Sequence, residues 1–144
     1  DRIVINVGTL ESRHWVRALG IHASHLLITM QPLVDQAHAV RTLGNEWRSH
    51  LGRDSQVHLV VDGMEGKVPP GLDELAETAG VNLLGGLPMD WRHRLMAMNS
   101  GLPIQEQSSR CRYSRSLQTL MNKLESQQEN SIGESWWQRL RSNG

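Results

Sequence analysis

The fold is decided by the stretch VHLVVDG at residues 57–63. A run of apolar, β-branched residues that ends in a polar turn is typical of a buried strand. A helical pattern follows near Leu72–Ala79, and a second apolar run at residues 81–84 leads into GGLPMD at residues 85–90. Strand, helix and strand in this order predict a βαβ unit with parallel strands. Ligands of such sheets bind at the carboxyl ends of the strands, where Asp62 and Pro88 are expected to lie.

The segments on either side extend this pattern. Further apolar runs occupy residues 2–7 and 25–30, and a helical pattern begins at about Val34. We therefore predict an α/β fold with a layered parallel sheet and flanking helices. Its strands are expected at residues 2–7, 25–30, 57–61 and 82–86.

The order of these segments resembles the C-terminal half of the MinD/ParA family of P-loop ATPases. RIVINVG at residues 2–8 looks like the Walker B strand of that family, and ASHLLITMQP at residues 23–32 is similar to its next strand and loop. SSRCRYSRSL at residues 108–117 resembles the entry to its last helix. The resemblance covers about residues 1–125. Members that place pilus-assembly or secretion machinery look most similar, followed by cellulose-synthesis and flagellar-placement relatives.

The phosphate loop of that family has no counterpart in this sequence. GMEGKV at residues 63–68 has too short a spacing for Gly-x-x-x-x-Gly-Lys-Ser/Thr, and Val68 has no hydroxyl group for magnesium. The resemblance places the phosphate-loop strand upstream of residue 1. ATPase activity is therefore an open question for this chain, for which we expect no catalytic residue.

Asn6 stands where the family has the Walker B aspartate. A neutral amide oxygen is a poorer partner for Mg²⁺ than a carboxylate. Two interpretations remain open. Either the ATPase is degenerate and Asn6 only caps the turn after its strand, or the protein binds nucleotide and hydrolyses it slowly.

The resemblance also implies a nucleotide-binding role for four residues at the predicted sheet edge. Asp62 and Gly63 take the place of the pair that meets adenine in the family. Pro88 and Asp90 belong to the proline turn that helps to form the wall of the base pocket. Together with Asn6 they are the predicted cofactor-binding residues. ATP and Mg²⁺ are the cofactors implied for the complete protein, and none is expected for this chain alone.

Composition excludes several other functions. The formal net charge is zero, which argues against nucleic acid as a partner. The single cysteine, Cys111, rules out an internal disulfide and fits a cytoplasmic protein. Seven histidines are present, but their spacing matches no metal motif and there is one thiol only. We therefore expect no metal site.

The last part of the chain reads as a separate segment, residues 126–144, after the domain formed by residues 1–125. It begins with a polar stretch, a linker or a frayed helix end at residues 125–131. It then becomes amphipathic, with five candidate contact residues: Trp136, Trp137, Arg139, Leu140 and Arg141. MinD-like proteins often end in a short helix that binds the inner membrane, and this tail looks like one. The alternative is that the tail packs onto its own domain or onto a neighbour.

Two classes of function follow from the sequence. The first is a MinD/ParA-like ATPase, degenerate or not, that positions or helps to assemble a membrane-associated apparatus such as a pilus or secretion system. The second is a non-enzymatic adaptor that keeps the fold as a protein-binding surface. A sheet without its phosphate-loop strand leaves apolar surface open. We therefore expect a homodimer or a protein partner.

Overall fold

Three of the four predicted strands form one parallel sheet. The computed structural model describes residues 3–9, 14, 18–52, 55–65 and 69–141, with the backbone alone for residue 45 and residues 128–141. Within this part of the chain, the strand order is β1-β2-β3. The strands are His25–Met30 (β1), Gln56–Met64 (β2) and Asn82–Pro88 (β3). Both pairings are parallel, with Ile28 opposite Leu59 and Leu59 opposite Leu83.

Helices connect and cover these strands. They are the 3₁₀ turn Gly20–His22 (η2) and the helices Val34–Arg48 (α2), Leu72–Ala79 (α3), Trp91–Ser100 (α4), Ile104–Gln107 (α5) and Arg112–Arg141 (α6). The predicted helices at Val34 and at Leu72–Ala79 are both present. Gly80 ends α3 in the left-handed conformation that favours glycine at this position.

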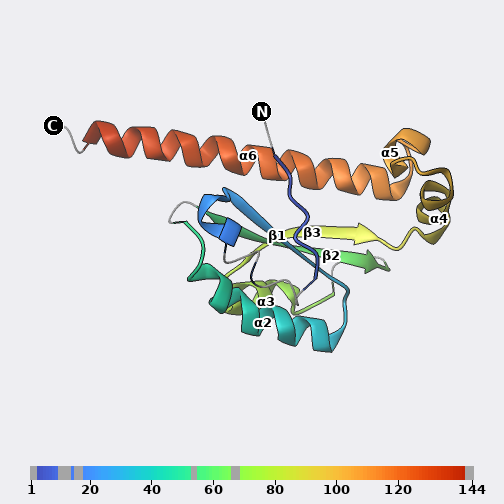
Figure 1. Ribbon diagram of the computed structural model, residues 1–144, viewed down its shortest axis with the longest axis horizontal. Coiled ribbons are helices and arrows are strands. Elements are labelled where there is room, and N and C mark those ends of the chain that lie inside the picture. The colour runs from blue at the N-terminus through green and yellow to red at the C-terminus, as the bar shows by residue number, and fades with distance from the viewer. Residues whose placement is uncertain (1–2, 10–13, 15–17, 53–54, 66–68, 142–144) are drawn as a thin grey trace.

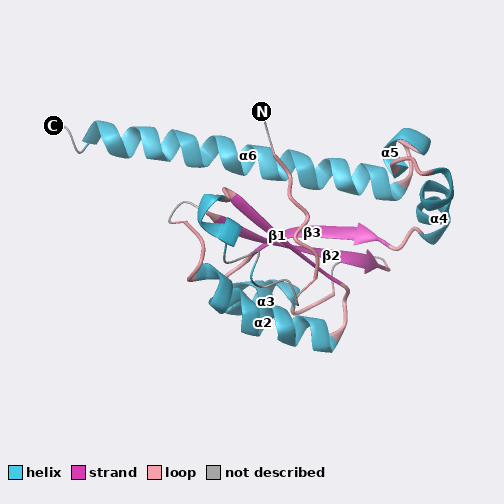
Figure 2. Ribbon diagram, viewed as in Figure 1, coloured by secondary structure: helices cyan, strands magenta, loops and turns pink. Residues whose placement is uncertain are grey.

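One face of the sheet packs against α2 and α3 (Figures 1 and 2). Side chains alternate between the faces of a strand, so that Val57, Leu59 and Val61 of β2 share this side. All three are buried in one apolar cluster with residues of α2 and α3, among them Leu43 and Ala76. This cluster is the main core of the domain.

The opposite face packs against α6, which crosses the sheet as a long helix (Figure 1). Tyr113, Leu117, Leu120 and Leu124 follow one another at helical spacing and contact Val60, Leu84 and Leu87. Gly85 permits this close approach, because a Cβ atom there would lie 2.8 Å from Leu120. Helices therefore lie on both faces, as is usual for a parallel sheet, but α6 packs over β2 and β3 and Leu27 of β1 stays exposed.

The predicted α/β fold class is confirmed, but the predicted strand at residues 2–7 is not. Residue 2 lies outside the described residues, and residues 3–8 form no strand. Ile3, Val4 and Ile5 are exposed, and Val7 packs against the edge of the main core. A strand needs a neighbour for its backbone groups, and among the described residues β1 pairs with β2 alone. The sheet accordingly has three strands in this part of the chain.

The C-terminal segment continues α6 without a break. Its backbone is helical from Arg112 to Arg141, so residues 125–131, expected as a linker or a frayed helix end, lie within the helix. The division into residues 1–125 and 126–144 stays a prediction. Among the described residues, no helix combines the length and the apolar character that a membrane crossing requires.

Candidate functional site

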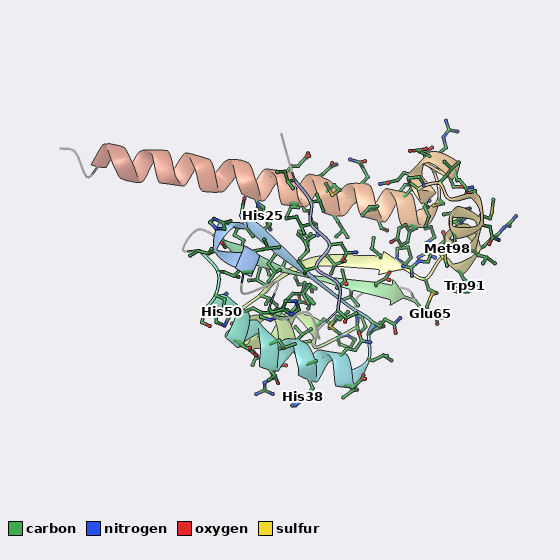
Figure 3. All side chains as sticks on the ribbon, in the orientation of Figure 1. His25, His38, His50, Glu65, Trp91 and Met98 are labelled. Carbon is green, nitrogen blue, oxygen red and sulfur yellow. The ribbon has the colours of Figure 1, made fainter. Side chains whose placement is uncertain are left out.

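The carboxyl edge of the sheet is the candidate site. Because all three strands are parallel, β2 and β3 end at the same edge, and the backbone N–H of Met89 donates to the carbonyl of Met64 at 2.9 Å. Figure 3 marks this end of the molecule by Glu65 and Trp91, while His25 lies at the other end of the sheet. Asp62 and Gly63 lie inside β2, which extends beyond the predicted range to Met64. Helix α4 begins immediately beyond this edge.

Asp62 is held in place by a cation from α4. Arg94 donates from Nη2 to Oδ1 of Asp62, and its guanidinium carbon lies 4.9 Å from the centre of the Tyr113 ring. Burial lowers the pKa of Arg94, but the hydrogen bond and the charge of Asp62 outweigh this effect, so the pKa is raised overall. A charged guanidinium thus connects β2, α4 and α6. No local sequence pattern indicates this pairing, because Arg94 and Asp62 are far apart along the chain.

Asp90 lies at the carboxyl edge of the sheet and also caps helix α4. Its carboxylate caps α4 and accepts from the backbone N–H of His93 at 3.4 Å. The same oxygen lies 2.7 Å from Nδ1 of His93. The hydrogen bond from His93 is the main cause of the lowered pKa of Asp90. Asp90 is therefore an anion that faces a histidine side chain.

Cys111 joins this pair from the start of α6. One donor atom from each of Asp90, His93 and Cys111 lies within 4.8 Å of the other two. The thiol sulfur is 3.2 Å from Oγ of Ser114, whose hydroxyl donates to the carbonyl of Ser108 at 2.8 Å. The sequence did not reveal this group, because the chain passes through α4 and α5 before it returns to the same place. The interval Asp-x-x-His at the start of a helix was the one local signal.

The remaining predicted residues divide into two groups. Gly63 has a positive φ of 77° and a Cβ there would lie 3.3 Å from the Met89 side chain, while Pro88 ends β3. Both therefore lie at the carboxyl edge with Asp62 and Asp90. Asn6 is exposed, and its Oδ1 accepts from the backbone N–H of Gly8 at 3.0 Å. Such a contact is what the first interpretation, in which Asn6 caps a turn, expects.

The five tail residues are described by their backbone alone. Trp136, Trp137, Arg139, Leu140 and Arg141 lie in the last turns of α6. Their side chains lie outside the described part of the structure, as do residues 66–68 within the rejected GMEGKV motif. Contacts of the tail with lipid, protein or its own domain therefore stay predictions.

A second histidine contact lies away from this edge, at the start of β1 and β2. Nδ1 of His25 is 3.0 Å from Nε2 of His58, and the two ring centres are 5.2 Å apart. His58 is fully buried, and its Nδ1 has no hydrogen-bond partner among the described residues. Burial, with a smaller contribution from the charge of His25, lowers the pKa of His58 from 6.5 to about 4. His58 is therefore neutral in the folded protein at neutral pH.

Comparison with known proteins identifies the fold. No protein-family profile matches the chain, and no curated protein matches it significantly. Among solved structures, a ParA family ATPase from Chlorobium tepidum TLS is similar, with a TM-score of 0.58 at 14% sequence identity. The match covers 72% of this chain and 41% of that chain, so this chain spans less than half of the solved structure. The chain therefore has a ParA-like fold and corresponds to part of that solved structure.

Proposed function

We propose that this chain is the C-terminal part of a MinD/ParA-type ATPase domain. The observation that carries the proposal is the ParA-like fold, with its parallel sheet and a polar carboxyl edge. The complete protein would position or help to assemble a membrane-associated apparatus such as a pilus or a secretion system. The amphipathic tail supports a place on the inner face of the membrane, and exposed apolar residues such as Leu27 support a homodimer or a protein partner.

In this proposal the carboxyl edge meets the nucleotide base. Asp62 accepts hydrogen bonds from the base, and Arg94 keeps the carboxylate in a fixed orientation. Gly63 leaves room next to the base because it has no side chain. Pro88 and the turn after it form one wall of the pocket. The phosphates and Mg²⁺ would be bound by a phosphate loop outside these residues.

The second candidate is a non-enzymatic adaptor with the same fold. One observation favours it: the Asn6 side chain already satisfies a backbone N–H of its own turn. The amide oxygen is a poorer ligand for Mg²⁺ than the carboxylate that the family has at this position. The protein would then use its surface, and not a nucleotide, to hold its partners.

Nucleotide binding by the complete protein separates the two candidates. A fluorescent ATP analogue is titrated in the presence and absence of Mg²⁺, and saturable, Mg²⁺-dependent binding supports the ATPase. Asp62→Asn should weaken this binding, whereas Asp73→Asn, an exposed change on α3, should leave it unchanged. A folded protein that binds no nucleotide would support the adaptor.

Asn6 supplies a test within the ATPase proposal. Asn6→Asp should raise ATP turnover, or its dependence on Mg²⁺, because a carboxylate binds a hard cation better than an amide. Turnover is measured as phosphate release over a series of Mg²⁺ concentrations. If neither quantity changes, Asn6 is a turn residue only.

A further inference from the structure

We propose that Asp90, His93 and Cys111 bind a divalent transition metal of the zinc type. Nothing in the ParA-like fold assigns a metal to these residues, and the proposal departs from the expectation of no metal site drawn from the sequence. It also goes beyond the proposed function, because it requires no nucleotide. It rests on three donor atoms that lie within 4.8 Å of one another.

The chemistry of the three donors fits zinc. A carboxylate oxygen, an imidazole nitrogen and a thiolate sulfur are its usual protein ligands, and three of them leave a fourth position for water. Thiolate and imidazole together favour zinc and similar metals over magnesium and calcium. The negative charges of the carboxylate and the thiolate balance the charge of a divalent ion. The group is therefore able to hold the ion without a further acidic residue.

The distances fit after small side-chain movements. Tetrahedral zinc, with bonds of about 2.0 Å to nitrogen or oxygen and about 2.3 Å to sulfur, places its ligand atoms about 3.3–3.6 Å apart. Asp90 Oδ1 and His93 Nδ1 are closer than this, at 2.7 Å, because they share a hydrogen bond. A metal that replaces this proton would separate the two atoms slightly and draw in the sulfur of Cys111.

The three ligands are held by rigid elements. Asp90 is the N-cap of α4, His93 lies in the first turn of this helix, and Cys111 precedes the first turn of α6. An independent contact keeps these helices together, because Arg94 reaches both Asp62 and the Tyr113 ring. Arg94 follows His93 directly, Tyr113 is two residues from Cys111, and Asp62 lies on β2. The backbone is thus fixed before a metal binds, which lowers the cost of ordering the ligands.

Groups around the ligands also support the site. The hydroxyl of buried Ser114 lies next to the Cys111 sulfur and is anchored to the carbonyl of Ser108. The backbone N–H of Ser114 donates to the same sulfur at 3.4 Å. This N–H···S bond persists when the sulfur is a thiolate, and such bonds orient ligands in metal sites. A bound metal would add a second link between the start of α4 and the start of α6, beside the Arg94 contact.

Cobalt(II) is a direct probe of this site, because its spectrum reports both geometry and sulfur ligation. Titration of the reduced chain with Co²⁺, without nucleotide, should give tetrahedral d–d bands and a thiolate-to-cobalt charge-transfer band that saturate at one equivalent. Zn²⁺ should displace the cobalt. Zn²⁺ should also slow the reaction of Cys111 with a maleimide in the unaltered chain, which needs no variant. Octahedral cobalt without a charge-transfer band, or an unchanged maleimide rate, would overturn the proposal.

Variants identify the ligands. Cys111→Ser should abolish the charge-transfer band, and His93→Gln should weaken Co²⁺ binding by at least about tenfold, a loss seen even for outer-sphere partners. His38→Gln, an exposed change on α2, is the matched control and should leave binding unchanged. Thermal unfolding without metal verifies that each variant is folded. Equal binding by His93→Gln and His38→Gln would show that these residues form a hydrogen-bonded cluster only.

Discussion

At the scale of the residue, the buried His58 makes a prediction about pH. Its pKa is about 4 in the folded protein and 6.5 as an ordinary value, so the unfolded chain binds the proton more readily. The contribution of His58 to stability is therefore complete above pH 6.5 and is lost as the pH falls from 6.5 to about 4. A difference of this size corresponds to a loss on the order of 3 kcal/mol.

Two measurements test this prediction. The imidazole signals of His58 in an NMR titration should have a midpoint near 4. The free energy of unfolding should depend less on pH in His58→Leu than in the unaltered protein, while His38→Gln should keep the full dependence, because His38 is exposed. A midpoint near 6.5 for His58 would contradict the burial argument.

Residue contacts were also the part of the site that the sequence predicted least well. The positions of Asp62 and Pro88 at the carboxyl edge followed from the strand pattern alone. The partners of these edge residues did not, because Arg94 reaches Asp62, and Cys111 approaches His93, only after α4 and α5 turn the chain back. Hydrophobic periodicity gives the register of a strand, but it carries no information about such long-range polar contacts.

At the scale of the element, Gly44 controls how closely α2 and α3 pack. A Cβ atom at this position would lie 2.6 Å from the carbonyl oxygen of Ala79, at the end of α3. Gly44→Ala should lower the free energy of unfolding by about 1–3 kcal/mol, because the two helices must separate. Alanine alone would favour a helix interior by about 1 kcal/mol, so a net loss isolates the contact between the helices.

Chemical denaturation of the variant measures this effect. His38→Ala, an exposed change on the same helix, serves as the control and should change stability by less than about 0.5 kcal/mol. A more stable Gly44→Ala protein would mean that α2 and α3 are not packed at this distance.

The elements themselves were largely predictable. The strands at residues 25–30 and 82–86 and the helices at Val34 and Leu72–Ala79 were found because each has one clear apolar pattern. The apolar run at residues 2–7 has the same composition, yet residues 3–7 form no strand. Composition describes what a strand can bury, whereas pairing decides whether it forms.

At the scale of the whole molecule, α6 links the sheet to the C-terminal segment. Its first half packs on the sheet through residues such as Leu117 and Leu120, and Figure 1 shows its C-terminal end extending beyond the strands. A helix that leaves its domain in this way can present its end to another surface. This arrangement agrees with the proposal that the tail meets lipid or a partner protein.

The last prediction tests that proposal. Trp136, Trp137 and Leu140 share one face of a helix, and two adjacent tryptophans on a charged tail make an apolar patch that a protein normally covers. Replacement of both tryptophans by glutamate should release the protein from anionic liposomes in a sedimentation assay, because the patch then carries negative charge. The midpoint of thermal unfolding should change little, since among the side chains that the structure describes Leu124 is the last of α6 to contact the core. Replacement of both Arg139 and Arg141 should weaken binding to anionic liposomes more than binding to neutral liposomes. A sharp fall in the unfolding midpoint, in a protein that never bound liposomes, would instead place the tail in the core of the domain.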